Sequence, residues 1–405
     1  MGSRLPLEGV RILDFFWQAA GPLASRTFAH FGAEVIRVES STRPCTLRTT
    51  GARAPDREGL NVCHIFNNLN TNKLSIALNL NHPRGLAIAK RLVALCDVVT
   101  NSFTGDRMER WGLGYEELVK VKPDIIMITM PVLGATGPYR HYRAWGSHII
   151  AGGGLNYLTG MPGRPPTGIG TLYSDFSANP FHAVVATMAA LRHRNRTGRG
   201  QFIDVAQYES TICFAETAIL DYTVNHRVQG PNGNRLPYAA PHGVYRCQGD
   251  DRWCAIGVFT EDEWKAFTSA IGSPDWTQEE RFASLPGRKQ HEDELDRLVE
   301  EWTSERTPEA VMATLQAAGV AAGIVQTAED LLTRDPQMRE RHYRVLEHPE
   351  MPPMNYDGQP IKMTDAPVEL RRAPLLGEHN DYIYRELLGL AEAEINDYMI
   401  AGVFE

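Results

Sequence analysis

The chain has 405 residues, of which 43% are hydrophobic and 22% are charged, and its formal net charge is −8. This balance is typical of a soluble globular protein that is long enough to form two domains. The acidic excess argues against broad electrostatic binding to nucleic acid or to an anionic membrane, although it leaves room for a local basic cleft.

The sequence lacks the usual signals of a membrane or disulfide-rich protein. No segment approaches the ~20 apolar residues of a membrane-spanning helix, and the first residues lack the apolar run of a signal peptide. The scattered cysteines form no CxxC pair, which favours free thiols over a disulfide frame or a zinc site. We therefore expect a cytoplasmic protein that holds no metal. The cysteines are Cys45, Cys63, Cys96, Cys213, Cys247 and Cys254.

The N-terminal part alternates between short apolar runs and helical spacing. Residues 10–15 form a β-rich run, residues 23–31 have helical spacing closed by Gly32, and residues 33–38 form a second strand. This is a βαβ unit, which implies parallel strands. Further strands are predicted at residues 74–80, 97–100 and 124–129. The repetition favours a large, doubly wound, Rossmann-like α/β domain.

A glycine-rich stretch follows, from residue 151 to residue 170. Long loops rich in glycine are uncommon inside compact domains and are often functional. A helix is predicted at residues 180–194 and a strand at residues 201–205. Asp175 stands between the glycine-rich stretch and this helix.

The pattern changes again near residue 225. Residues 225–330 contain two strand candidates followed by amphipathic helices, which predicts a smaller α+β domain. We expect residues 1–224 to form the first part of the large domain. We also expect residues 331–405 to return and complete it.

Asp175 has two interpretations when its neighbourhood is considered alone. An aspartate ahead of a helix usually satisfies free backbone amides at the helix start, and Ser177 or Asn179 is an equally good candidate for that task. The alternative is an ionised carboxylate that takes part in chemistry near backbone donors and the helix dipole. Composition does not decide between them.

Seven segments, in order along nearly the whole chain, resemble the family III (CaiB/BaiF-type) CoA-transferases. One alone would be weak evidence, whereas the ordered set is specific. The segments are residues 7–15, 32–39, 72–80, 110–118, 197–201, 373–379 and 387–389.

The resemblance implies a mechanism for Asp175. In this family an aspartate ahead of the helix that leads to the Thr-Gly-Arg-Gly turn is the nucleophile, and Asp175 holds that place. It implies aspartyl-anhydride and aspartyl-CoA intermediates, with a coenzyme A thioester as substrate and no permanently bound cofactor. Each step passes through an oxyanion. The glycines at residues 152–154 are candidate donors, and a plain turn is as good an interpretation of them.

The resemblance also implies contacts with CoA. Arg43 and Arg48, after the second strand, are looser candidates for its phosphates. The positions that match the family are Gln18, Ala19, Leu78, Asn79, Leu80, Asn81, Arg110 and Arg143.

Two departures from the family pattern narrow the substrate. Residues 235–259 lack the four-glycine run of the formyl-CoA:oxalate branch, and Gly153 stands where α-methylacyl-CoA racemases have a histidine. A glycine cannot exchange a proton. The nearest resemblance is to members that act on dicarboxylates, so we expect transfer from succinyl-CoA to an acid such as malate. Arg48 or Arg164 is expected to hold the second carboxylate.

Three alternatives stay open. The first is an intramolecular C1–C4 transfer on mesaconyl-CoA. The second is a racemase-like isomerase in which Asp175 is a general base. The third is a non-catalytic CoA-binding or partner subunit.

The resemblance finally implies an oligomer, because family members form interlocked homodimers. A hetero-oligomer with a related subunit is the alternative. The partners expected are therefore acyl-CoA, small carboxylic acids and another chain of this family, without nucleic acid or membrane.

Overall fold

The computed structural model describes residues 5–405 and divides into two compact units. The first is built from the residues up to Asn156 together with Gly168–Gln229 and Gln337–Glu405. The second contains Tyr157–Thr167 and Gly230–Pro336.

A six-stranded parallel sheet forms the centre of the first unit, in the order β3-β2-β1-β4-β5-β6. The order reverses between β1 and β4, which defines a doubly wound sheet with a switch point. The expected α/β architecture is therefore confirmed. The strands are β1 (Arg11–Phe15), β2 (Glu34–Glu39), β3 (Leu74–Ala77), β4 (Val98–Asn101), β5 (Ile126–Thr129) and β6 (Phe202–Asp204).

The two faces of this sheet are covered by different elements, because alternate residues of a strand point to opposite sides. Ile12 packs with α1 (Ala20–His30) and α9 (Ala178–Thr197). Leu13 packs on the opposite face with α3 (Pro83–Val93) and with α5 (Tyr115–Val121).

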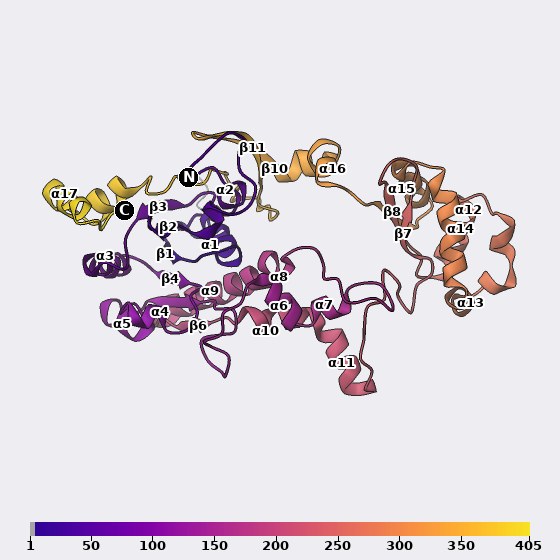
Figure 1. The fold of residues 1–405 in the computed structure, drawn as a ribbon, viewed down its shortest axis with the longest axis horizontal. Helices are drawn as coiled ribbons and strands as arrows, with labels where there is room; N and C mark the ends of the chain where they lie inside the picture. Colours follow the sequence, from indigo (N-terminus) through magenta and orange to yellow (C-terminus); the bar gives the residue numbers. More distant parts are fainter. Residues whose placement is uncertain (1–4) are drawn as a thin grey trace. The chain divides into compact units, whose positions relative to one another are not determined.

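The C-terminal segment completes the second of these faces. Figure 1 shows α17 (Glu392–Ile400), in yellow, in the part of the unit that holds the indigo N-terminal strands. Hydrogen bonds to the edge strand β3 hold the C-terminal segment in place. Asn380 Oδ1 accepts one from the amide of Ala77 at 2.9 Å. The hydroxyl of Tyr384 donates to the carbonyl of Ala77 at 2.8 Å.

The sequence suggested that the glycine-rich stretch is one long loop, but the structure shows that parts of it are helical. Its first part forms α6 (Gly146–Gly152) and α7 (Leu155–Leu158), and a single turn of helix, α8 (Tyr173–Phe176), precedes α9. Helix α9 is also longer than predicted, and it ends at Gly198, which has a left-handed φ of 71°. The sequence signals missed these helices because they are short and held by packing.

Smaller elements complete the first unit. Within the described residues, no helix is long and apolar enough to span a membrane. The remaining elements are α2 (His64–Leu69), α4 (Arg107–Arg110), α10 (Gln207–Ile212), α11 (Glu216–Asn225), β10 (Tyr343–His348) and β11 (Met351–Asp357).

The second unit is the α+β fold expected of the smaller domain. Its three-stranded antiparallel sheet consists of β7 (His242–Arg246), β8 (Trp253–Gly257) and β9 (Ala321–Ile324). Phe267 and Leu315 are fully buried in its core. Its helices are α12 (Glu261–Ala270), α13 (Leu285–Gln290), α14 (Glu292–Ser304), α15 (Pro308–Ala317) and α16 (Ala328–Thr333).

Candidate active site

A cavity of about 450 Å³ lies where the parallel strands of the first unit end, and we call it the sheet-edge cavity. Phe15 ends β1 and Phe103 follows β4, so the cavity spans the switch point of the sheet. Ligands of doubly wound sheets bind at this position. Leu78, Asn79, Leu80 and Asn81, which the sequence predicted to be cofactor contacts, all line this cavity.

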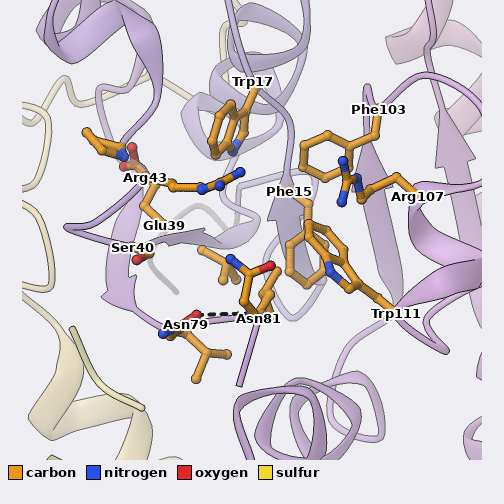
Figure 2. Close-up of a pocket in the computed structure, with 14 residues that line it drawn as sticks. Phe15, Trp17, Glu39, Ser40, Arg43, Asn79, Asn81, Phe103, Arg107 and Trp111 are labelled. Carbon is orange, nitrogen blue, oxygen red and sulfur yellow. Dashed lines mark hydrogen bonds between the residues drawn. The ribbon is translucent and has the colours of Figure 1, made fainter. Parts of the chain in front are cut away.

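Cationic and aromatic side chains line the same cavity. Figure 2 shows Arg43 reaching into it from one side, with Arg107 beside Phe103 and Trp111 on the other. The Phe103 ring meets Trp111 edge-on at a centroid distance of 5.4 Å. Neither arginine forms a salt bridge within residues 5–405. An anionic ligand with a flat ring, such as a nucleotide phosphate, suits this combination.

Two of the candidate arginines lie elsewhere. Arg110 lines neither this cavity nor the one described next, and its exposed side chain pairs with Asp106 at 3.1 Å. Arg107, on the same short helix, lines the sheet-edge cavity, and the CoA contact expected of Arg110 stays a prediction. The place of Arg107 at the start of the helix that follows β4 is the signal that could have found it.

Arg48 is committed to the protein and not to a ligand. It is fully buried, and its Nη2 lies 2.9 Å from Oε2 of Glu39. Its Nη1 donates to Oδ1 of Asn61 at 2.8 Å. The expectation that Arg48 meets a phosphate or a substrate carboxylate is therefore wrong, because breaking a buried pair leaves an unpaired charge.

A second cavity, of about 690 Å³, contains Asp175, and we call it the Asp175 cavity. Gln18, Ala19 and Arg143 line it, as does Gly146 at the start of α6. Gln18 has a left-handed φ of 64°, so the loop after β1 turns sharply here. The structure therefore gathers three predicted contact residues around the predicted nucleophile.

The two cavities share part of their lining. Trp17 and Phe103 belong to both, and their rings meet edge-on at a centroid distance of 5.8 Å. A long ligand with an anionic end and a reactive end could therefore occupy both cavities along these two rings.

Asp175 is buried, with 7% of its surface exposed. Burial raises the pKa of its carboxyl to about 6, and a hydrogen bond from Asn179 opposes that shift. Nδ2 of Asn179 lies 3.3 Å from Oδ1 of Asp175. The carboxylate is thus ionised at neutral pH but poorly solvated, which suits a nucleophile or a base.

The structure excludes the helix-capping interpretation of this region. The N-cap residue of α9, Ser177, makes no side-chain capping hydrogen bond within the described residues. The hydroxyl of Ser177 donates to the carbonyl of Tyr173 at 2.6 Å, and Asn179 bonds to other side chains. The sequence could not settle this point, because capping and catalysis favour the same residue types.

Gly146 is a site residue that sequence reasoning missed. A Cβ at this position would overlap Oδ2 of Asp175 and lie 2.9 Å from its Cγ. Only glycine lets α6 begin this close to the carboxylate. No local sequence signal reveals a requirement that comes from tertiary contact.

The amides of Gly153 and Gly154 are not free to act as donors in this site. The amide of Gly153 donates to the carbonyl of Ile149 at 2.8 Å, and that of Gly154 donates to Ala151 at 3.2 Å. A Cβ at Gly153 would lie 2.9 Å from Cγ2 of Thr211. These glycines therefore end α6 and let it pack closely against α10, which corrects the expectation of an oxyanion site there.

Among residues 5–405, no group of three or more histidine, cysteine or acidic side chains is placed to hold a metal ion.

Comparisons with known proteins agree on one group of relatives. A family model described as CoA-transferase family III matches residues 7–380. A succinyl-CoA–D-citramalate CoA-transferase of Chloroflexus aurantiacus is 34% identical over 392 residues, which cover 96% of each chain. The beta subunit of a succinyl-CoA–L-malate CoA-transferase from the same organism is 30% identical, over 98% of this chain and 97% of that one.

The fold has a close counterpart among solved structures. A crystal structure of a CaiB/BaiF family protein from Brucella suis matches with a TM-score of 0.86 and 30% sequence identity. The match covers 94% of this chain and 99% of that chain.

Proposed function

The chain belongs to family III of the CoA-transferases, as its seven motifs indicated, and we propose that it moves CoA between carboxylic acids through covalent intermediates on Asp175. The observation that carries this proposal is a buried carboxylate in a cavity that shares Trp17 and Phe103 with the arginine-lined cavity at the sheet edge. CoA is a long molecule with phosphates at one end and a thiol at the other, so the paired cavities fit its two ends.

We propose that the nucleotide part of CoA occupies the sheet-edge cavity. Arg43 and Arg107 would then meet its phosphates, and residues 78–81 would line the nucleotide. The pantetheine arm would pass Trp17 and Phe103, which line both cavities. The thioester carbonyl would reach Asp175.

The chemistry follows from a carboxylate nucleophile. The Asp175 carboxylate attacks the thioester carbonyl, and the C–S bond breaks to give a mixed anhydride and CoA thiolate. The thiolate then attacks Cγ of Asp175, which releases the donor acid and leaves an aspartyl-CoA thioester. The acceptor carboxylate attacks the same Cγ, the Cγ–S bond breaks, and a new anhydride and CoA thiolate are formed. CoA thiolate finally attacks the acceptor's acyl carbon and regenerates Asp175.

The substrates we propose are succinyl-CoA as donor and a small dicarboxylate such as malate as acceptor. Of the arginines considered for the second carboxylate, Arg48 is occupied by Glu39, whereas Arg143 lines the Asp175 cavity. We therefore propose Arg143 for this role in place of a CoA phosphate contact. Arg164 lies in the second unit and stays a prediction. Intramolecular C1–C4 transfer on mesaconyl-CoA would use the same residues.

A racemase-like isomerase is the second candidate, because a carboxylate with a pKa of about 6 could also abstract a proton. Gly153, at the position of the racemase histidine, counts against it, since its Cα packs against α10 and it has no side chain to exchange a proton.

A homodimer is the assembly we propose, with a hetero-oligomer as the alternative. Phe181, Val185 and Met188 recur at helical spacing on α9 and are exposed, as are Leu220 and Val224 on α11. Exposed apolar faces of this kind are typical of subunit interfaces. The six cysteines are unpaired, which is compatible with a cytoplasmic protein.

A substrate panel tests the proposed activity. Succinyl-, mesaconyl-, itaconyl- and acetyl-CoA would each be incubated with malate, citramalate, succinate and acetate, and the CoA esters would be separated by mass spectrometry. We expect new esters with dicarboxylates, abolished in Asp175→Ala and weakened in Arg143→Ala with a raised KM for the acid. Transfer that survives in Asp175→Ala would contradict the proposal.

A further inference from the structure

Asn179 is the residue whose side chain bonds to the Asp175 carboxylate, and it lies in the first turn of α9. Its side chain is fully buried. Burial of an amide is costly unless both its oxygen and its nitrogen are bonded, so the remaining contacts of Asn179 matter. These contacts come from α10, where Gln207 Oε1 lies 3.2 Å from Nδ2 of Asn179.

The direction of this hydrogen-bonded chain is fixed by a backbone group. The carbonyl of Met130 only accepts hydrogen bonds, and it accepts one from Nε2 of Gln207 at 2.8 Å. Gln207 must therefore turn Oε1 toward Asn179, which must in turn present its NH₂ group. Ser210 Oγ donates to Oδ1 of Asn179 at 2.5 Å and favours the same orientation. One N–H of Asn179 is thus directed at Asp175.

The two oxygens of Asp175 consequently have different surroundings. Oδ1 faces the N–H of Asn179, whereas Oδ2 is the oxygen nearer to Gly146, where an added Cβ would overlap Oδ2 and lie 3.2 Å from Oδ1. Within residues 5–405, Oδ2 accepts no side-chain hydrogen bond. Oδ1 is therefore the oxygen held by a hydrogen bond, and Oδ2 can form a new bond without losing one.

We infer that Asn179 is a catalytic residue: it donates to the oxyanion that forms on Oδ1 whenever a nucleophile attacks Cγ of Asp175, and it reserves Oδ2 for bond formation. Gln207 and Ser210 are positioning residues that act through Asn179. This inference rests on the proposed nucleophilic role of Asp175.

The bonds made and broken give each oxygen a distinct fate. Oδ2 joins the donor acyl group in the anhydride and leaves with the donor acid when CoA thiolate attacks Cγ. During that attack the C=Oδ1 electron pair moves onto Oδ1, and it returns as the carboxylate leaves. The acceptor acid then supplies a new oxygen at the Oδ2 position. Oδ1 stays on Asp175 through every turnover, provided that Asn179 prevents the carboxylate from rotating.

Isotope exchange tests this assignment. The enzyme would be incubated with succinyl-CoA and excess succinate carrying oxygen-18 in its carboxylates, over many turnovers. The mass of the peptide that contains Asp175 would then be measured by mass spectrometry. We expect the wild-type residue to gain one labelled oxygen. In Asn179→Leu, which keeps the side-chain shape but removes the donor, we expect two labelled oxygens and a kcat lower by about 100-fold.

Two variants on α10 keep the test decisive if Asn179→Leu folds poorly. Ser210→Ala removes one bond to Asn179, and we expect partial labelling of the second oxygen with a few-fold loss of kcat, about the value of one neutral hydrogen bond. Thr211→Val is the matched control, because the Thr211 hydroxyl donates to the backbone carbonyl of Gln207 and not to Asn179. It should label like the wild type.

The labelling results distinguish an error in the role of Asn179 from an error in the proposed covalent mechanism. A wild-type enzyme that gains both oxygens, or an Asn179→Leu enzyme that gains only one at an unchanged rate, would overturn the role of Asn179 alone. Equal effects of Ser210→Ala and Thr211→Val would overturn the positioning role of Ser210. No label on Asp175 of the wild type during turnover would instead overturn the covalent mechanism.

Discussion

Asp175 combines burial with a single side-chain hydrogen bond, and that combination has a cost in stability. Its carboxyl has a pKa of about 6 in the folded chain, against an ordinary value of 3.8. The folded state therefore holds a proton that the unfolded state releases between these two values. Stability falls as pH rises through this window, and the full penalty of the ionised carboxylate is present above pH 6.

Asp175→Asn should make the protein inactive and more stable. At pH 7.5 the neutral amide removes the penalty, and we expect a gain in the free energy of unfolding of about 1 to 3 kcal/mol. Near pH 4 the gain should shrink toward zero, because the wild-type carboxyl is then protonated. Chemical denaturation at both pH values measures this. A variant that is destabilised at pH 7.5, or equally stabilised at both values, would refute the burial argument.

Gly146 makes a separate prediction at the same carboxylate. In Gly146→Ala the new methyl group would displace Oδ2 of Asp175, the end of a side chain, and not the backbone. We expect transfer to fall by about 100-fold or more, as for other small misplacements of a reacting group, with the melting temperature little changed. Gly230→Ala is a suitable control, because nothing lies within 4 Å of a Cβ there. Equal loss in both variants would remove Gly146 from the site.

The two arginines that we propose as contacts for the CoA phosphates lie at the carboxyl edge of the sheet, on short segments that follow the strands. Arg43 follows β2 and Arg107 begins α4, and both line the sheet-edge cavity. Arg110 lies on the same helix as Arg107 but pairs with Asp106 at the surface.

Arg43→Ala and Arg107→Ala should therefore weaken CoA binding, whereas Arg110→Ala should not. Loss of one charge-assisted phosphate contact is expected to raise the KM for acyl-CoA by about 10-fold, and the wild-type KM should rise with salt concentration. Steady-state kinetics at two ionic strengths provide the measurement. A larger rise in KM for Arg110→Ala than for Arg107→Ala would indicate instead that Arg110, the residue expected from the sequence, contacts the phosphates.

The elements also show how far sequence could predict this protein. The parallel strands followed from their apolar runs, and Asp175 followed from its place among the seven motifs. The short helix α6 could not be predicted, because its glycines are typical of a loop. The helix depends on packing of Gly152 and Gly153 against Tyr208 and Thr211 of α10, which the sequence does not show. Asn179 was visible only as a capping candidate. Its partner Gln207 lies 28 residues away, and the contact between them exists only in the folded chain.

Arg48 illustrates the opposite error. Its position after β2 suggested a ligand contact, but sequence does not reveal that Glu39, at the end of the same strand, binds it in the interior. A charged residue near a site can therefore belong to the scaffold that shapes the site and make no contact with the ligand.

At the scale of the whole molecule, the exposed apolar faces of α9 and α11 predict self-association. Sedimentation at micromolar concentration should give a mass twice the 45.2 kDa of the chain. Val185→Glu combined with Val224→Glu should lower the dimer fraction, because a charge in an apolar interface loses its hydration. Val121→Glu on α5 is the control for a similar substitution at another exposed valine. A monomer at all concentrations would contradict the proposed assembly.

A nucleophilic Asp175 requires that CoA and Asp175 become covalently linked during turnover. The most direct measurement is to mix enzyme with succinyl-CoA, quench in acid and determine the masses of the intact protein and its peptides by mass spectrometry. We expect a mass gain equal to one CoA, less water, on the peptide that contains Asp175. Hydroxylamine should convert this adduct to a hydroxamate, and Asp175→Asn should form neither. Deuterium uptake next to the thioester carbonyl, without any adduct on Asp175, would contradict the covalent mechanism and favour the isomerase.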